Sequence, residues 1–278
     1  MIEGGTRVAC RPPVFFGNGI LQNRKLARLA PVTRNLSPAH HHFVADGVSM
    51  QPQIQSLCDG DAMNSLDFPE YTYRERLADG IIHLIGVTAA IVGAIILLVM
   101  ATDTLSGASA LSLTVYSFGL VAVFCFSAAY HLTGGSPLKA LLKRFDQAAI
   151  YFKIASTYTP IMVINLVGWP GTGLLALIWS VATFGMTTKL FFPHRLVRTS
   201  YVLYLVLGWC AVLIFAPLVD ALSMQTLMLI LAGGILYTVG VVFHLWPGLR
   251  YQNAIWHSFV LGGAGCHYAA IMSSVALA

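Results

Sequence analysis

Side chains that could bind a metal ion or transfer protons occur inside long apolar segments of this 278-residue chain. Ionisable residues are costly within a membrane-spanning helix, so each one there is a candidate for function. Residues four apart in a helix lie on one face, one turn above the other. That spacing occurs in Ser127/His131, Asn253/His257 and Glu75/Asp79/His83. We therefore predict polar faces on several helices that point toward a common centre.

A further polar stripe is formed by Asp146, Lys153 and Thr157, since seven and eleven residues are close to whole helical turns. Two or three imidazoles with a nearby carboxylate can hold zinc and leave a position for water. We predict a metal or proton-transfer site in which Asp146 orients the water or takes its proton. Ser127 would donate a hydrogen bond to a developing oxyanion. The alternative is that these groups only hydrogen-bond between helices and hold them together.

The composition indicates which class of protein would carry these residues. The chain is 57% hydrophobic and 10% charged, whereas soluble domains carry roughly 25% charged residues. Six of the sixteen Lys and Arg residues precede residue 40, and nine others flank apolar segments. This distribution favours a membrane protein over a basic nucleic-acid-binding surface, so we expect no nucleic-acid partner.

The chain divides into two parts with different composition. Residues 1–70 are polar and lack a sustained hydrophobic period, which predicts a disordered cytosolic extension. Residues 71–278 contain apolar segments long enough for a helix to cross roughly 30 Å of hydrocarbon. These segments lie at about 77–100, 110–132, 146–166, 171–192, 199–218, 224–246 and 254–277. We therefore predict an all-α fold, a seven-transmembrane helix bundle.

The positions of the basic residues predict the orientation in the membrane. Nine Lys and Arg residues lie before the first segment and in every second connection after it, and the other connections carry none. Cytosolic loops are enriched in Lys and Arg. The N-terminus is thus expected in the cytosol and the C-terminus outside. With this topology, most of the ionisable residues lie in or near the cytosolic half.

Four stretches of the sequence have the order and spacing of known motifs. They are residues 127–131 (SAAYH), 144–150 (RFDQAAI), 154–160 (IASTYTP) and 254–260 (AIWHSFV), the last followed by His267 and Tyr268. They resemble the motifs S-x-x-Y-H, R-x-D-H-A-A-I, I-A-G-T-Y-T-P and H-x-I-W-H-x-F-V of the haemolysin III family. That family is the bacterial branch of the progestin and adiponectin receptor group. The resemblance extends from about residue 75 to the end of the chain.

The resemblance implies a multi-pass protein of the bacterial inner membrane that interacts with membrane lipids. It also implies a zinc site on the cytosolic side. His131 and His257 fall on two of the family's zinc ligands. Asp146 falls on the family aspartate and Ser127 on the family serine, which we predict to be catalytic.

The third family ligand, a histidine, falls on Asn253 in this chain. Because an amide is a much poorer zinc ligand than imidazole, we expect weakened zinc binding. His83 or His244 could then supply a replacement ligand. Lys153 is a second departure, since the family usually has an apolar residue there. A cation there would oppose the binding of a second cation; the alternative is that Lys153 pairs with Asp146 or extends to the surface.

Three functions agree with this reading. The first is a zinc-dependent hydrolase of lipid amides such as ceramides. The second is a pore-forming or membrane-perturbing protein, although no segment has the ring of charge that a water-filled pore prefers. The third is a sensor of membrane state, analogous to the eukaryotic receptors. The sequence does not indicate a protein partner.

Overall fold

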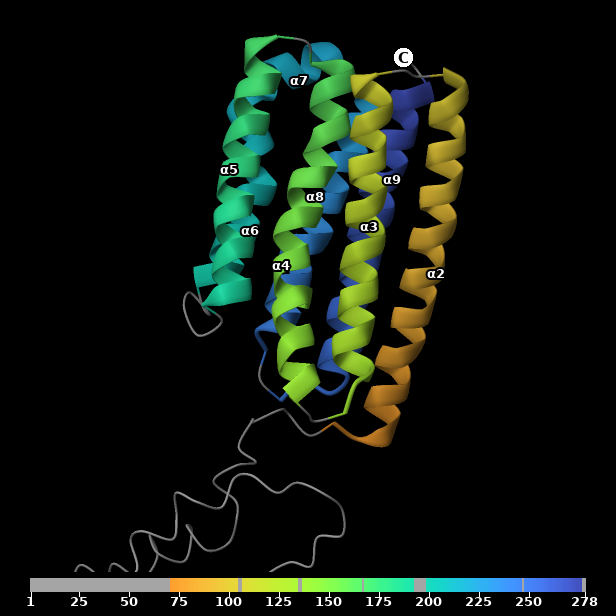
Figure 1. Ribbon diagram of the computed structural model, residues 1–278, viewed down its shortest axis with the longest axis vertical. Helices are drawn as coiled ribbons and strands as arrows, with labels where there is room; N and C mark the ends of the chain where they lie inside the picture. The colour runs from red at the N-terminus through yellow and green to blue at the C-terminus, as the bar shows by residue number, and fades with distance from the viewer. Residues whose placement is uncertain are drawn as a thin grey trace, which may run out of the picture. The chain divides into compact units, whose positions relative to one another are not determined.

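The computed structural model describes residues 71–104, 107–134, 137–166, 168–192, 199–246 and 248–276. These residues belong to one compact unit, Leu66–Ala278. All their regular secondary structure is helical, with no strand among the described residues, as predicted (Figure 1). The predicted disordered extension over residues 1–70 lies outside the described residues.

Helical elements that follow one another directly join into one continuous stretch, here called a rod. The rods run up and down through the unit (Figure 1). Two of the rods change winding along their length, through the π-helix η2 and the 3₁₀-helix η3. The elements in chain order are α2 (Tyr73–Thr104), α3 (Ala108–Leu132), α4 (Pro137–Pro160) with η2 (Ile161–Asn165), α5 (Trp169–Phe191), α6 (Thr199–Trp209) with η3 (Cys210–Ile214) and α7 (Phe215–Ala221), α8 (Met224–His244) and α9 (Gln252–Ala276).

The observed rods agree with the predicted apolar segments, except at the start of α4. That helix begins at Pro137, nine residues before the predicted start at residue 146. Proline is favoured at the first position of a helix, where its missing N–H is not needed. The added turns carry Lys139, Lys143 and Arg144. Hydropathy cannot detect these turns, because they are helical without being apolar.

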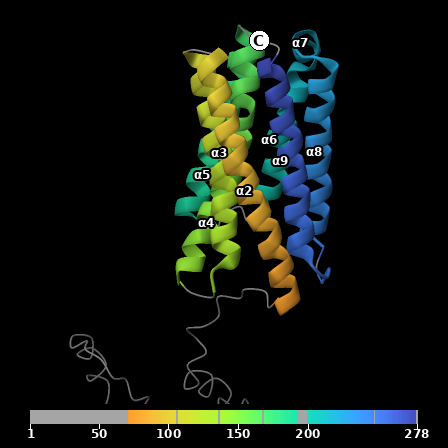
Figure 2. The ribbon, with the colours of Figure 1, turned by 90° about the vertical axis from the view of Figure 1, so that its right-hand side faces the viewer.

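The rods form a closed ring in which each packs against its neighbours. The order around the ring is α2, α3, α4, α5, α6, α8 and α9, and α9 packs back against α2. The first and last helices therefore lie side by side, as both views show (Figures 1 and 2). Chemical groups from opposite ends of the sequence can thus meet inside the ring.

The surface of this unit is apolar and its interior contains polar groups. Large apolar side chains such as Leu84, Val99 and Phe118 are more than half exposed, whereas Asp79 and Lys153 are buried. Among the described residues, five helical stretches are long and apolar enough to cross a membrane: α2, α3, α5, the rod from α6 to α7, and α8. This distribution is typical of a protein surrounded by lipid.

The rod from α6 to α7 shows how an irregular backbone is stabilised in such an interior. Pro217 lies in the first turn of α7, and the chain before it winds as the 3₁₀-helix η3. The Tyr158 hydroxyl from α4 donates to the carbonyl oxygens of Gly208 and Leu207, at 2.6 and 3.3 Å. It also accepts from the backbone N–H of Ala211 at 3.0 Å. A side chain thus satisfies backbone groups that cannot bond to lipid.

Replacing Tyr158 by Phe should therefore destabilise the protein while leaving the ring contacts in place. The expected loss is about 1–3 kcal/mol, because buried backbone groups lose their partner. The measurement is thermal unfolding of the purified protein in detergent. Tyr73→Phe is the matched control, since Tyr73 is 75% exposed. An equal melting temperature for the two variants would contradict this role of Tyr158.

Candidate metal centre

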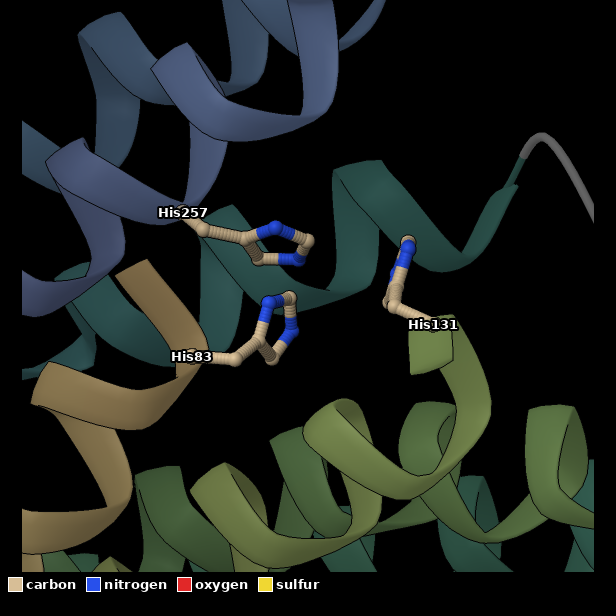
Figure 3. A group of neighbouring side chains, drawn as sticks. All are labelled: His83, His131 and His257. Atoms are coloured by element: carbon tan, nitrogen blue, oxygen red, sulfur yellow. The ribbon is translucent and has the colours of Figure 1, made fainter. Parts of the chain in front are cut away.

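Three histidine side chains from three helices meet inside the ring. His83 comes from α2, His131 from the last turn of α3 and His257 from the second turn of α9 (Figure 3). One ring nitrogen from each lies within 4.8 Å of the others. His83 and His257 are buried, and His131 is partly buried. These helices become neighbours only through the ring, because His83 and His257 are 174 residues apart in sequence.

The carboxylate of Asp79 lies against all three imidazoles. Its Oδ1 is 2.6 Å from Nδ1 of His257 and 3.5 Å from Nδ1 of His83. Its Oδ2 is 3.4 Å from Nδ1 of His131. No other carboxylate in the described part of the chain makes an ion-pair contact of this kind. Asp79 therefore orients the three rings together.

These contacts determine which nitrogens are available to a metal. His83 Nδ1 lies 2.8 Å from the backbone carbonyl oxygen of Asp79, and only an N–H can bond to a carbonyl. His257 Nδ1 likewise donates to Asp79 Oδ1 at 2.6 Å. In the neutral rings the proton is then on Nδ1, and Nε2 carries a lone pair. Metal-binding histidines commonly have this arrangement, with the second nitrogen bonded to a carboxylate or carbonyl.

Ser127 lies between two of these histidines. Its Oγ is 3.3 Å from Nε2 of His83 and 3.5 Å from Nε2 of His257. Asp146 on α4 lines the same cavity as Ser127 and the three histidines.

Asn253, predicted at a ligand position, lies beside His131. Its Nδ2 is 3.4 Å from Nδ1 of His131, the nitrogen that also faces Asp79. An amide at this point can help to orient the ring. His83 supplies a third imidazole, so the cluster has three although residue 253 is an asparagine. The loss of a histidine at position 253 is therefore no longer a reason to expect weakened zinc binding. The ligand set itself stays a prediction.

The two other sequence candidates lie away from the three histidines. His244 bonds through Nε2 to the Tyr201 hydroxyl at 3.2 Å. Lys153 was expected to pair with Asp146 or reach the surface, and this prediction is wrong. It is 5% exposed, and its ammonium donates to Thr157 Oγ1 at 2.6 Å. Asp146 is seven residues away on the same helix, roughly 10 Å along the axis, and the ion pairs among the described residues do not include these two.

The three imidazoles match the donor set of a zinc site with an open fourth position. With Zn–N bonds of about 2.0–2.1 Å, ligand nitrogens in a tetrahedral site are roughly 3.4 Å apart. The separations of up to 4.8 Å therefore require a contraction of up to about 1.4 Å when a metal binds. The sequence analysis named His83 only as one of two possible replacement ligands, although its four-residue spacing from Asp79 was a further signal. Asp79 was given no role.

Zinc content tests this assignment. We expect the purified full-length protein to hold about one zinc ion per chain, and His83→Ala and His131→Ala each to lose it, because two imidazoles bind zinc far more weakly than three. Inductively coupled plasma mass spectrometry measures the metal. His244→Ala is the matched control and should retain zinc.

Asp79→Asn provides a second test on the same preparation. Removing the charge that orients the rings should weaken zinc binding about 10–100-fold, as measured by competition with a chelator. Full zinc occupancy in His83→Ala would exclude that residue from the ligand set.

Comparisons with known proteins point to one family. The family model described as "Haemolysin-III related" matches residues 71–268. Hemolysin-3 of Bacillus cereus is 37% identical over 199 residues, which cover 72% of this chain and 91% of that protein. The Hemolysin-3 homolog of Bacillus subtilis (strain 168) is 35% identical over 202 residues, 73% of this chain and 95% of that protein.

A more distant similarity reaches mammalian proteins. The human monocyte to macrophage differentiation factor is 29% identical over 206 residues, 72% of this chain and 84% of that protein. No solved structure shows a significant match. The family model covers more than half of the chain, and it includes all three histidines. The chain is therefore an integral membrane protein of the haemolysin III family.

Proposed function

We propose that this protein is a zinc-dependent hydrolase of a lipid amide. The supporting observation is the group of three imidazoles from α2, α3 and α9, with nitrogens within 4.8 Å, on the wall of a cavity of about 940 Å³. Ligand cavities typically have volumes of about 300–1,000 Å³. Apolar residues such as Ile150, Val241 and Val260 also line the cavity, which suits a lipid chain.

The residues of the chain have distinct roles in this proposal. His83, His131 and His257 would hold the metal, and Asp79 fixes the orientation of their rings. Zinc bound there supplies Lewis acidity that polarises an amide carbonyl.

Asp146 and Ser127 carry the proton transfer and the charge stabilisation. Asp146 accepts a proton from the attacking water and returns it to the leaving amine, so that amide and water yield a carboxylic acid and an amine. Ser127 donates a hydrogen bond to the negative charge that develops on the carbonyl oxygen. Both residues line the cavity that contains the histidines, and the Ser127 Oγ lies 3.3 Å from Nε2 of His83, which supports this division of roles.

Hydrolysis of a short-chain ceramide by the full-length protein in detergent tests the proposal. We expect fatty acid release that falls at least about 10²-fold in Asp146→Ala, because general acid–base catalysis is lost. Ser127→Ala should also lower the rate about 10²-fold. Fatty acid is measured by mass spectrometry.

Asp220→Asn is the control for these variants, since Asp220 lies on α7, away from the histidine cluster. It should keep full activity. Zinc-loaded wild-type protein that releases no fatty acid from amide lipids would reject the hydrolase.

We also propose that the rods cross the bacterial inner membrane seven times, with the N-terminus in the cytosol. Five rods have the length and apolar composition of spans. The rod of α4 and η2 and the helix α9 lie within the same ring and have similar lengths. The connections from α3 to α4 and from α8 to α9 lie at the end of the unit where α2 begins (Figure 1). In the sequence these connections adjoin or contain Lys139 and Arg250, which supports the orientation.

Reporter fusions test this topology. Alkaline phosphatase fused after Ala278 should be active, because that enzyme folds only outside the cytosol. Green fluorescent protein fused after Gly134, in the connection before α4, should fluoresce, because that protein matures in the cytosol. A phosphatase fusion after Gly168 is the control and should be as active as the C-terminal one. Fluorescence of a fusion after Ala278 would contradict an odd number of crossings.

A further inference from the structure

Lys153 is a buried amine that the proposed hydrolysis does not use. It lies on α4 and is 5% exposed. Its Nζ donates to Thr157 Oγ1 at 2.6 Å and lies 4.5 Å from the ring centroid of Tyr116. Lys153 and Thr157 also line the cavity that contains the histidine cluster. The amine is therefore accessible to a molecule inside the cavity.

No carboxylate compensates this group in the described part of the chain. The ion pairs found there all join Asp79 to a histidine. Thr157 contributes a neutral oxygen, whose own proton is donated to the backbone carbonyl of Lys153 at 2.7 Å. An ammonium buried without a counter-ion is unfavourable in such an interior. A bound anion would supply the missing charge.

The Lys153 ammonium has three N–H donors, and the structure gives it one acceptor among the described residues, Thr157 Oγ1. The Tyr116 hydroxyl beside it is buried and has no hydrogen-bond partner. A ligand that brings acceptor oxygens would satisfy the remaining ammonium protons and the Tyr116 hydroxyl.

We propose that Lys153 binds the carboxylate of an organic anion that occupies the inner part of this cavity. A carboxylate offers two acceptor oxygens and one negative charge, so it compensates the ammonium and leaves an oxygen for a tyrosine hydroxyl. The apolar wall near Lys153, which includes Ile150 and Ile154, suits an attached hydrocarbon. The carboxylate is either that of a small soluble acid or the head of a fatty acid. The contacts of Lys153 differ from those of the histidine cluster, and both lie in one cavity.

Equilibrium binding to the full-length protein in phosphatidylcholine nanodiscs tests the proposal, with empty nanodiscs as the background. Labelled laurate should bind saturably, and Lys153→Met should weaken binding about tenfold or more, because a charge-assisted hydrogen bond is lost. Lys153→Arg should restore most of the affinity. Dodecanol, which has the same chain without the charge, should bind at least about tenfold more weakly than laurate to the unmodified protein.

Competition with acetate distinguishes the two sources of the carboxylate. Displacement of laurate by acetate indicates a small soluble acid, and its absence indicates a fatty acid; both results support a carboxylate site if binding depends on Lys153. His131→Ala is the matched control and should bind laurate as the unmodified protein does, which separates this site from the histidine cluster.

Thermal unfolding provides a second readout. Laurate should raise the melting temperature of the unmodified protein and leave that of Lys153→Met unchanged. Equal affinity of the unmodified protein for laurate and dodecanol would overturn the proposal, and this comparison requires no variant. Equal laurate binding by Lys153→Met would also overturn it.

Discussion

The site and the closure of the ring both depend on the contacts of the Asp79 carboxylate, which is buried among three imidazoles. A charged group in an interior shielded by lipid needs partners, and water is scarce there. Asp79 finds its partners on α2, α3 and α9. These helices must meet for that to happen, so the polar cluster and the contact between the first and last helices stabilise each other.

The same constraint explains the irregular parts of the backbone. Every N–H and C=O that leaves a regular helix inside the bilayer needs another partner. Tyr158 supplies that partner for the turn around η3, across from α4. The interior thus contains polar side chains that hydrogen-bond to irregular backbone, and others that line the cavity. The outer face stays apolar, as the exposure of Leu84 and Phe118 shows.

The cavity has two polar regions, which favour ions of opposite charge. On His83 and His257, protons are held on Nδ1 and directed to Asp79, which leaves nitrogen lone pairs on Nε2. Lone pairs attract a cation. Around Lys153 the donors exceed the acceptors, which favours an anion. One cavity can therefore hold a metal ion near one end and a negatively charged group deeper inside.

The sequence alone determined the helical class, the approximate limits of the rods and the helix faces that carry Ser127, His131 and His257. These follow from local rules, because the bilayer requires long apolar helices and a helix repeats every 3.6 residues. The start of α4 at Pro137 was missed, since its first turns are helical but not apolar. These local rules do not predict which helix faces meet.

The tertiary structure decided the composition of the site. Only the closed ring brings His83 from α2 to His257 on α9, and it makes Asp79 their common partner. It also placed Lys153 against Thr157 and Tyr116 rather than Asp146. The physical reason is that contacts between distant segments depend on the order and rotation of packed helices. Spacing along one helix carries no information about either.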